Sequence, residues 1–329
     1  MSRRIVILND TSGRSHHGCT RVMRLLTEAL AARGAEILAT SPARQDWAAD
    51  AGFLAALERA ETIVINGEGT LHHGRAHGER LLRVAVHPAA GGKRLALINA
   101  LYDSNPEGWG AYLNRFTLLS ARDAQSAEAL SRATGQKVGW VPDLSLSSPG
   151  PAPDGPRRGI LIGDAVRAGQ RRAIAQATRH WPNRRYLPTK TRASDLWRWP
   201  ILGPVAKSAL FAAYTGTSPI GRPPFDLART EADYLDHLSA AALHVTGRFH
   251  GVCLSLLTMT PFLAVDSVSG KIGRLLDDLG LGRGRLLTPE ALGRAALDHP
   301  ISPEEETQIK AALADAQRRA SALFDSLSA

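Results

Sequence analysis

Short apolar runs alternate with helical patterns along the first half of the chain. Each run spans five or six residues, and the segments between the runs place apolar residues at helical spacing. Strands that alternate with helices on this scale are typical of a parallel sheet covered by helices, so we expect an α/β fold. The predicted strands are Arg4–Leu8, Glu36–Thr40, Thr62–Asn66, Arg94–Asn99, Phe116–Ala121 and Lys137–Val141, and the clearest predicted helices are Arg21–Arg33, Ala48–Arg59 and Ala124–Leu130.

One segment interrupts this alternation and divides the chain. Residues 147–156 read SSPGPAPDGP, which sustains neither a helix nor a central strand. At 329 residues the chain is too long for one ordinary hydrophobic core and suits two domains. We predict an N-terminal domain over residues 1–146, a linker over 147–157 and a C-terminal domain over 158–300. Residues 301–329 contain a predicted helix, Pro303–Leu327, which we expect to pack back on the first domain.

A second α/β series follows the linker. Thr230 with Asp233 resembles a capping box, with Asp in the place of the usual Glu or Gln. The predicted strands of this series are Gly159–Gly163, Arg185–Pro188, Leu243–Thr246 and Pro261–Asp266, and its predicted helices are Ala165–His180, Thr230–Ala242, Val252–Thr258 and Ile272–Leu279.

Composition limits which binding partners and which cellular compartment we expect. The net charge of +9 comes with six lysines and 34 arginines, a bias that a GC-rich coding sequence also produces. No basic run is interleaved with aromatic residues, so we expect acidic small molecules or glycans as partners and no nucleic acid. Cys19 and Cys253 are too few for a disulfide framework or a metal cluster. The apolar run Ile5–Leu8 is too short for a signal-peptide core, so we expect a cytoplasmic protein.

Residues Leu196–Tyr214 fit neither series. The segment contains two tryptophans, two prolines, Lys207 and a largely apolar second half. One interpretation is an inserted helical hairpin that packs on its own domain. The other is a lid, or a surface that meets a lipid-linked acceptor at the inner face of the membrane.

The strongest site prediction rests on the turn Thr246–Gly251. Ligands of open α/β sheets bind beyond the carboxyl ends of the strands, where helix N-termini direct N–H groups outward. Arg248 and His250 stand between two glycines, Gly247 and Gly251, and both flanks are apolar. Placing these side chains there is costly unless they face a polar cavity. We therefore predict a site for a small anionic ligand, with His250 suited to proton transfer near neutral pH; the alternative is a structural histidine at a helix start.

The turn Asn66–His73 is a second candidate. Gly67 and Gly69 flank Glu68 and allow a close backbone approach to a ligand, although a strand-to-helix turn with positive φ explains them equally well. His72 and His73 have no third metal ligand at a suitable spacing, so we interpret them as polar wall residues and expect no metal site.

Two further turns place cations after predicted strands. Arg122 can direct a bidentate fork at a carboxylate or phosphate, or it can form a local pair with Asp123. Lys271 stands at a helix start, where the helix dipole favours acidic groups. An incoming anion would explain that lysine, and an exposed loop lysine is the alternative.

Taken in order, these segments resemble the polysaccharide pyruvyltransferase family. The resemblance implies two Rossmann-like domains that face across a cleft, as in GT-B glycosyltransferases. It also implies a transferase of polysaccharide biosynthesis, such as that of a bacterial cell-surface glycan. Phosphoenolpyruvate would be the donor and co-substrate, a sugar diol of a glycan or glycolipid the acceptor, and a pyruvate ketal and phosphate the products, with no other cofactor. The matching stretches are Val64–Leu71, Ser120–Asp123 with Ser126 and Leu130, Val141–Asp143, Gly247–Gly251, and Pro261–Asp266 with Lys271.

The resemblance also assigns roles to residues. Donor binding falls to Arg122, Arg248 and Lys271, with Gly247 and Phe249 beside them, and catalysis to His250 with Arg248. Two departures from the family pattern occur: Glu68 replaces a third glycine, and Phe249 stands where leucine is common.

The chemistry of the donor suits these residues. Two arginines and a lysine can hold the carboxylate and the phosphate of phosphoenolpyruvate. His250 is our hypothesis for the acid that protonates the methylene carbon. Glu68 and Asp123 are candidate bases by position, and Gly67 and His72 are candidate acceptor contacts. Without a metal cluster, we expect the activity to survive chelators.

Two other functions stay open. A GT-B glycosyltransferase would share the fold and use a nucleotide sugar, although no acidic residue stands where it could hold a ribose in the second domain. A non-catalytic sugar- or anion-binding relative would keep the site and lack turnover.

Overall fold

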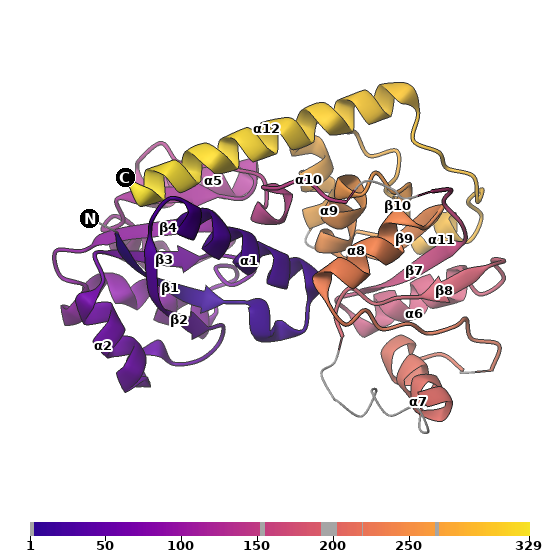
Figure 1. Cartoon of the computed structure of the whole chain (residues 1–329), viewed down its shortest axis with the longest axis horizontal. Coiled ribbons are helices and arrows are strands. Elements are labelled where there is room, and N and C mark those ends of the chain that lie inside the picture. Colours follow the sequence, from indigo (N-terminus) through magenta and orange to yellow (C-terminus); the bar gives the residue numbers. More distant parts are fainter. Residues whose placement is uncertain (1–2, 152–154, 192–202, 219, 267–269) are drawn as a thin grey trace. The chain divides into compact units, whose positions relative to one another are not determined.

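The computed structural model describes residues 3–151, 155–191, 203–218, 220–266 and 270–329. The chain divides into two compact units. Unit 1 comprises Met1–Arg14, Cys19–Ser148 and Ala314–Ala329, and unit 2 comprises Ser15–Gly18 and Pro149–Leu313 (Figure 1). The boundary after Ser148 lies within the predicted linker 147–157, of which residues 152–154 lie outside the described chain.

Unit 1 is built on a six-stranded sheet in the order β2-β1-β3-β4-β5-β6, in which every pair is parallel. The strands are β1 (Arg4–Asp10), β2 (Glu36–Pro42), β3 (Thr62–Asn66), β4 (Arg94–Ala100), β5 (Leu118–Ala121) and β6 (Gly139–Trp140). The helices between them are α1 (His17–Ala32), α2 (Ala51–Arg59), α3 (Ala76–Leu82), α4 (Gly110–Leu113) and α5 (Ala124–Thr134).

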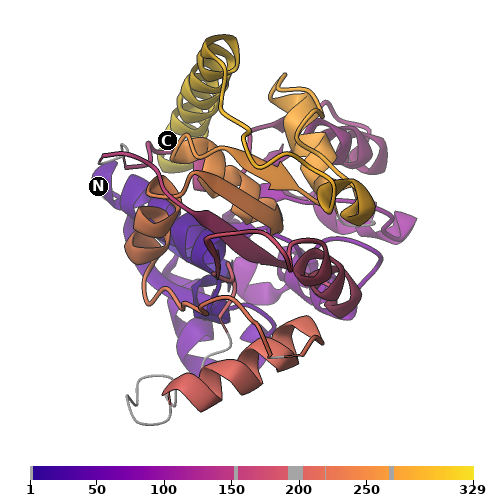
Figure 2. The same cartoon turned by 90° about the vertical axis from the view of Figure 1, so that its right-hand side faces the viewer.

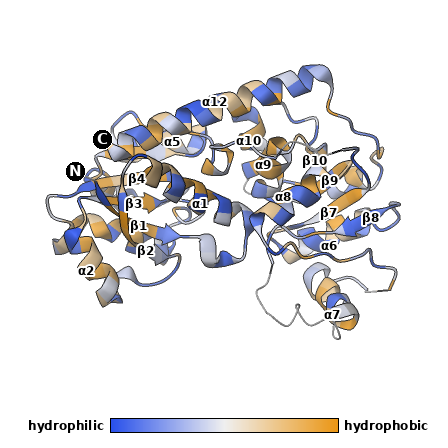
Figure 3. Cartoon of the chain, in the orientation of Figure 1, coloured by the Kyte–Doolittle hydropathy of each residue, from blue (hydrophilic) through white to orange (hydrophobic). Residues whose placement is uncertain are grey.

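Both faces of this sheet are buried. Val6 and Leu8 of β1 belong to one hydrophobic cluster, whereas Ile5 and Ile7 belong to another. Because successive side chains of a strand point to opposite faces, the continuous apolar run of β1 fills two cores at once. Figure 3 shows the resulting hydrophobic colour along the central strands of the sheet.

Unit 2 contains a second parallel sheet, in the order β10-β9-β7-β8. Its strands are β7 (Ile160–Ala165), β8 (Arg184–Tyr186), β9 (Leu243–Gly247) and β10 (Phe262–Ala264). Its helices are α6 (Ala168–Ala177), α7 (Gly203–Thr215), α8 (Glu231–Ser239), α9 (Phe249–Leu257), α10 (Lys271–Asp278) and α11 (Pro289–Leu292), and α12 (Pro303–Ser328) closes the chain.

Helix α7 accounts for part of the segment that fits neither series. Leu210, Phe211 and Tyr214 are buried in the hydrophobic core of unit 2, and α7 lies beside α6 (Figures 1 and 2). For residues 203–214 this packing favours an inserted helix on its own unit, whereas residues 196–202 lie outside the described chain. No helix in the described ranges is long and apolar enough to cross a membrane.

Two local predictions are corrected by the structure. Helix α9 begins at Phe249, not at Val252, because the chain enters the helix directly after β9 with Arg248 as the N-cap residue. The capping box at α8 is incomplete: the Thr230 side chain accepts from the N–H of Asp233, but the Asp233 carboxylate accepts from the N–H of Arg229 and not of Thr230.

Candidate active site

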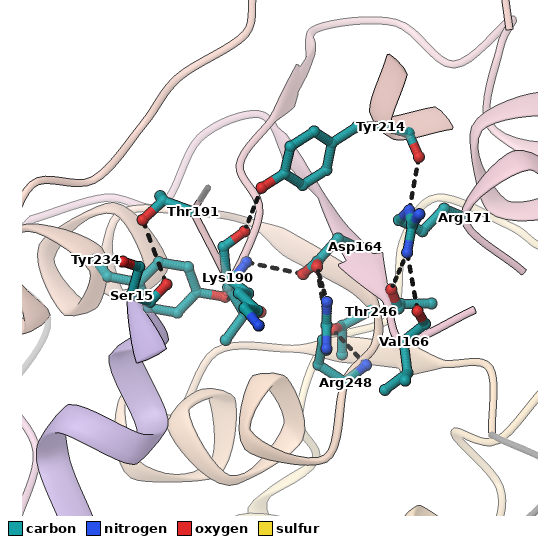
Figure 4. Close-up of polar contacts among 12 residues, drawn as sticks. Ser15, Asp164, Val166, Arg171, Lys190, Thr191, Tyr214, Tyr234, Thr246 and Arg248 are labelled. Carbon is teal, nitrogen blue, oxygen red and sulfur yellow. Dashed lines mark hydrogen bonds and ion pairs between the residues drawn. The ribbon is translucent and has the colours of Figure 1, made fainter. Parts of the chain in front are cut away.

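Arg248 is fixed at the carboxyl end of β9 by a carboxylate from the neighbouring strand. Asp164 lies near the end of β7, which pairs with β9 so that Ala165 stands opposite Gly247. One oxygen of Asp164 accepts hydrogen bonds from Nε of Arg248 at 2.8 Å and from Nη2 at 2.5 Å (Figure 4). The other oxygen accepts from the N–H of Thr189 at 2.9 Å. The side chain of Asp164 is fully buried, so the orientation of the guanidinium is strongly constrained.

This pairing leaves one side of the guanidinium available. Within the part of the chain that the structure describes, Nη1 of Arg248 donates no hydrogen bond. The Arg248 side chain is 12% exposed, and the residue caps the start of α9, where backbone N–H groups and the positive end of the helix dipole favour an anion. The arrangement suits a carboxylate or phosphate group that lies against Nη1.

His250 lies in the first turn of the same helix and is 5% exposed. Two glycines allow this close geometry. A Cβ on Gly247 would lie 2.5 Å from the Cβ of Ala165, and a Cβ on Gly251 would lie 2.3 Å from Oγ1 of Thr246. Residues without a side chain are therefore needed at both positions to bring β9, α9 and β7 together.

A short segment from the beginning of the chain contacts His250. Ser15–Gly18 belongs to unit 2, and the ring of His16 lies edge-on to that of His250, with 5.1 Å between ring centroids. A Cβ on Gly18 would lie 2.2 Å from Cγ of His250. The His250 imidazole therefore rests on the backbone of Gly18, which leaves no room for a larger residue there.

Residues 189–191, which follow β8, hold Ser15–Gly18 in place through backbone hydrogen bonds. The N–H of His17 donates to the carbonyl of Thr189 at 3.2 Å, and the N–H of Thr191 donates to that of Ser15 at 2.8 Å. Between these bonds, the carbonyl of Lys190 accepts from the hydroxyl of Tyr214 on α7 at 2.8 Å (Figure 4). Lys190 is half-buried, and its backbone forms an isolated antiparallel bridge with that of His16.

Burial controls the protonation of these histidines. Desolvation, aided by the charges of His250 and Arg248, lowers the pKa of His16 well below its usual value. His17 stacks on Tyr234 at 4.8 Å between ring centroids, and its burial lowers its pKa to about 4. Both rings are therefore neutral near pH 7 and can donate or accept hydrogen bonds without adding charge.

Glu68 lies in a tight turn after β3 in unit 1. Its carboxylate accepts hydrogen bonds from Oγ1 of Thr11 at 2.7 Å and from Sγ of Cys19 at 2.9 Å, and the residue is 3% exposed. Gly67 cannot carry a side chain, because a Cβ would lie 2.6 Å from the Cα of Ala100. The positive φ of 60° at Gly69 completes the turn, so local backbone geometry explains both glycines.

His72 lies at the end of the same turn. Its Nε2 is 3.2 Å from the carbonyl of Gly69, its ring lies edge-on to that of His73, and the residue is 9% exposed. A role for His72 in acceptor binding stays a prediction.

Arg122 follows β5 in unit 1 among acidic side chains. Its Nη1 lies 3.6 Å from a carboxylate oxygen of the buried Asp143, and its Nε lies 3.9 Å from one of Asp123. Asp123 also caps α5 by accepting from the N–H of Ser126 at 2.7 Å. Asp123 thus caps α5 and lies within ion-pair distance of Arg122, as the alternative of a local pair predicts, while donor binding by Arg122 stays a prediction.

Lys271 is the first residue of α10. The N–H groups of Ile272 and Gly273 donate to the carboxylate of Asp266, at 3.2 Å and 2.8 Å. Asp266 thus supplies negative charge at the start of α10, where the sequence predicts an incoming anion. Residues 267–269 lie outside the described chain, and the role of Lys271 in donor binding stays a prediction.

Comparison with known proteins identifies the family. The family model described as polysaccharide pyruvyl transferase matches residues 35–269. The chain belongs to the polysaccharide pyruvyl transferase family. The match covers Glu68, Arg122, Arg248 and His250 and ends two residues before Lys271. A search of the curated proteins found no match.

Solved structures share the fold of this pyruvyl transferase family member. A trehalose-6-phosphate synthase superposes with a TM-score of 0.57 at 10% identity, covering 99% of each chain. A UDP-forming trehalose-phosphate synthase from Burkholderia xenovorans gives 0.54 at 13% identity, covering 99% of this chain and 98% of the other. A UDP-GlcNAc 2-epimerase from Neisseria meningitidis gives 0.52 at 9% identity, covering 98% and 99%. At these identities the likeness is one of fold, and it confirms the predicted GT-B-like α/β architecture.

The sequence reasoning missed several residues of the site. His16 and His17 precede the family match. Asp164 and Lys190 fall just outside the predicted elements, and Tyr234 lies inside the predicted helix Thr230–Ala242, where it had no assigned role. A signal for the two histidines was present, because residues 11–18 read TSGRSHHG directly after an apolar strand. Asp164 carried a weaker signal, as the single acidic residue at the end of an apolar run.

Proposed function

We propose that this family member transfers the pyruvyl group of phosphoenolpyruvate to two hydroxyl groups of a sugar and releases inorganic phosphate. In the balanced reaction, one hydroxyl adds to C2 of phosphoenolpyruvate while C3 gains a proton and becomes a methyl group. The second hydroxyl then displaces phosphate from C2. One hydroxyl proton thus replaces the proton taken up at C3, the other leaves with the phosphate, and the product is a cyclic ketal that carries a carboxylate.

The observation that carries this proposal is the arrangement of Arg248 and His250 around the first turn of α9. Asp164 holds the Arg248 guanidinium so that Nη1 and the helix start can bind an anionic group. His250, two residues later, is buried against Gly18 and next to His16. In the proposal, Arg248 binds the donor and stabilises charge that develops at C2, and His250 delivers the proton to C3.

The acceptor is proposed by chemical class. A family named for polysaccharide pyruvyl transfer supports a sugar or glycan acceptor, and we include lipid-linked precursors of a bacterial cell-surface glycan, reached from the cytoplasm. No cofactor or metal enters the proposed reaction, and assay in the presence of a chelator checks that expectation.

Donor identity separates the proposal from its alternatives. The protein is incubated with phosphoenolpyruvate or with a panel of nucleotide sugars, and the shift in Tm is compared, because a ligand that binds only the folded state stabilises it. Phosphate release is then measured with phosphoenolpyruvate and a panel of sugar acceptors. Stabilisation by a nucleotide sugar alone would favour a glycosyltransferase. Stabilisation by phosphoenolpyruvate without turnover on any acceptor would favour a non-catalytic relative.

A further inference from the structure

A second polar site lies in unit 2, between α6, β8 and the segment that follows α7. It is a cavity of about 640 Å³, a volume in the range of small-molecule sites. None of the described residues that line it is Asp or Glu, whereas five of them are basic: Arg172, Arg179, His180, Arg184 and Arg222. Arg248, His250 and Lys271 do not line it, so the cavity is separate from the candidate active site.

The charge around the cavity is not a simple result of arginine-rich composition. Between Asp164 and Asp226 the sequence holds a single acidic residue, Asp195, against eleven lysines and arginines. The whole chain, in contrast, holds 31 acidic and 40 basic residues. A coding bias towards arginine does not remove acidic residues, so this segment is depleted of the groups that would neutralise it.

Arg184 is anchored by uncharged groups. Its Nη1 donates to the carbonyl of Trp181 at 2.8 Å and its Nη2 to that of Gly221 at 3.1 Å. Partial burial lowers the pKa of Arg184, which is the effect of an environment that solvates its charge poorly. Carbonyl groups orient the guanidinium without cancelling its charge, so an anion bound nearby would relieve that cost.

The remaining walls offer both polar and apolar contacts. Arg172 on α6 and Arg179, two residues beyond its end, are both exposed. Cδ of Arg172 would lie 3.8 Å from a Cβ on Gly216, which also lines the cavity. The hydroxyl-bearing Thr217 and Ser218 line the same side, while the apolar wall consists of Ile162, Tyr186, Phe211 and the exposed Ile220. A ligand that fits these walls has an anionic group and an uncharged part.

We propose that this cavity binds a phosphate ester, with the phosphate or diphosphate among Arg172, Arg179 and Arg184 and the uncharged part against the apolar wall. Arginine is suited to this task because its planar fork pairs with two phosphate oxygens at once. The same chemistry is found in a nucleoside diphosphate and in an isoprenyl phosphate. This binding site goes beyond pyruvyl transfer and does not depend on it.

The test measures dissociation constants by isothermal titration calorimetry for UDP, geranyl phosphate and inorganic phosphate. The double variant Arg172→Ala/Arg179→Ala should weaken binding of the preferred phosphate ester tenfold or more, which corresponds to about 1.4 kcal/mol. Gln176→Glu adds a negative charge to the cavity at almost constant size and should weaken binding in the same direction. Arg158→Ala is the matched control, since Arg158 is an exposed arginine of unit 2 that does not line the cavity.

The outcomes separate the sources. Tighter binding of UDP than of inorganic phosphate indicates a nucleotide, and tighter binding of geranyl phosphate indicates a lipid phosphate. Because the active-site residues are unchanged in these variants, phosphate bound at Arg248 would not respond to them. The proposal is overturned if neither ester binds more tightly than about 1 mM. It is equally overturned if neither cavity variant weakens binding beyond the effect of Arg158→Ala.

Discussion

The residue that decides the geometry of the candidate active site is Asp164. Its carboxylate binds two nitrogens of Arg248 and the N–H of Thr189, and it has no exposed surface. A buried carboxylate of this kind is costly by itself and is tolerated because its partners are complete. Asp164 therefore positions Arg248 without needing to contact the ligand.

The variant Asp164→Asn tests this positioning role. An amide keeps the shape but removes the charge, so the guanidinium loses its fixed orientation and is left partly buried without a counter-charge. We expect the free energy of unfolding to fall by about 3 kcal/mol and donor affinity to fall more than turnover of bound donor. Urea unfolding and the separate KM and kcat values check both parts. Unchanged stability together with unchanged KM would contradict the role.

Gly18 provides a second prediction at this scale. Gly18→Ala places a Cβ 2.2 Å from Cγ of His250, so the imidazole has to move. Since displacement of a catalytic group by about 1 Å can cost about a hundredfold in rate, we expect a loss of kcat of that order. Gly13→Ala is the control, because nothing lies within 4 Å of its Cβ. Equal activity of the two variants would show that the position of His250 does not matter.

At the scale of elements, buried histidines join the helices and strands around the site. His17 stacks on Tyr234 of α8, and His244 of β9 bonds to the Ser255 hydroxyl of α9 at 2.7 Å. Burial lowers the pKa of His17 to about 4 and that of His244 to about 3. The folded protein therefore keeps both rings neutral at pH values where the unfolded chain protonates them.

This difference predicts how stability depends on pH. Each folded pKa lies below the unfolded value of 6.5, so the contribution is complete above about pH 6.5 and is lost as the pH falls towards the folded pKa. The slope is at most about 1.4 kcal/mol per pH unit for each histidine. Urea unfolding between these limits should show a shallower slope for His17→Gln than for the original protein. Identical slopes would mean that His17 is protonated in the folded state.

Sequence patterns predicted the elements better than they predicted the site. β3 occurs at the predicted residues, because a fully buried parallel strand leaves an uninterrupted apolar run. α9 starts three residues early, since its first turn contains the polar residues that a periodicity search assigns to a loop. Arg248 and His250 were found because they interrupt apolar sequence. Asp164 and His16 were not, because their partners are 84 and 234 residues away and no local pattern reports such pairing.

At the scale of the whole molecule, the last helix ties the end of the chain to unit 1. Residues from Ala314 onward belong to that unit, and Ala320, Leu323, Phe324 and Leu327 join the cluster that also holds Ile5 and Ile7 of β1. Arg33, which directly follows α1, adds an ion pair with Asp325 at 2.6 Å. One face of the N-terminal sheet is therefore completed by the most distant part of the sequence.

Phe324→Ala tests the contribution of this helix. Phe324 is 4% exposed, so removal of its ring leaves a cavity and should lower the free energy of unfolding by about 3–5 kcal/mol. Ser326→Ala, at an exposed position two residues further along, should change it by less than about 0.5 kcal/mol. Thermal and urea unfolding of both variants give the comparison. A loss below about 1 kcal/mol for Phe324→Ala would show that α12 is not part of that core.

The central claim is that Arg248 binds the anionic donor and that His250 acts on it chemically. Its most direct test is the dissociation constant for phosphoenolpyruvate of the original protein, Arg248→Lys and His250→Ala, each checked for folding by circular dichroism. We predict that Arg248→Lys weakens binding about tenfold or more, because lysine cannot keep both the Asp164 pair and the donor, and that His250→Ala changes it little while abolishing ketal formation. Undiminished binding by Arg248→Lys, or full turnover by His250→Ala, would contradict the account.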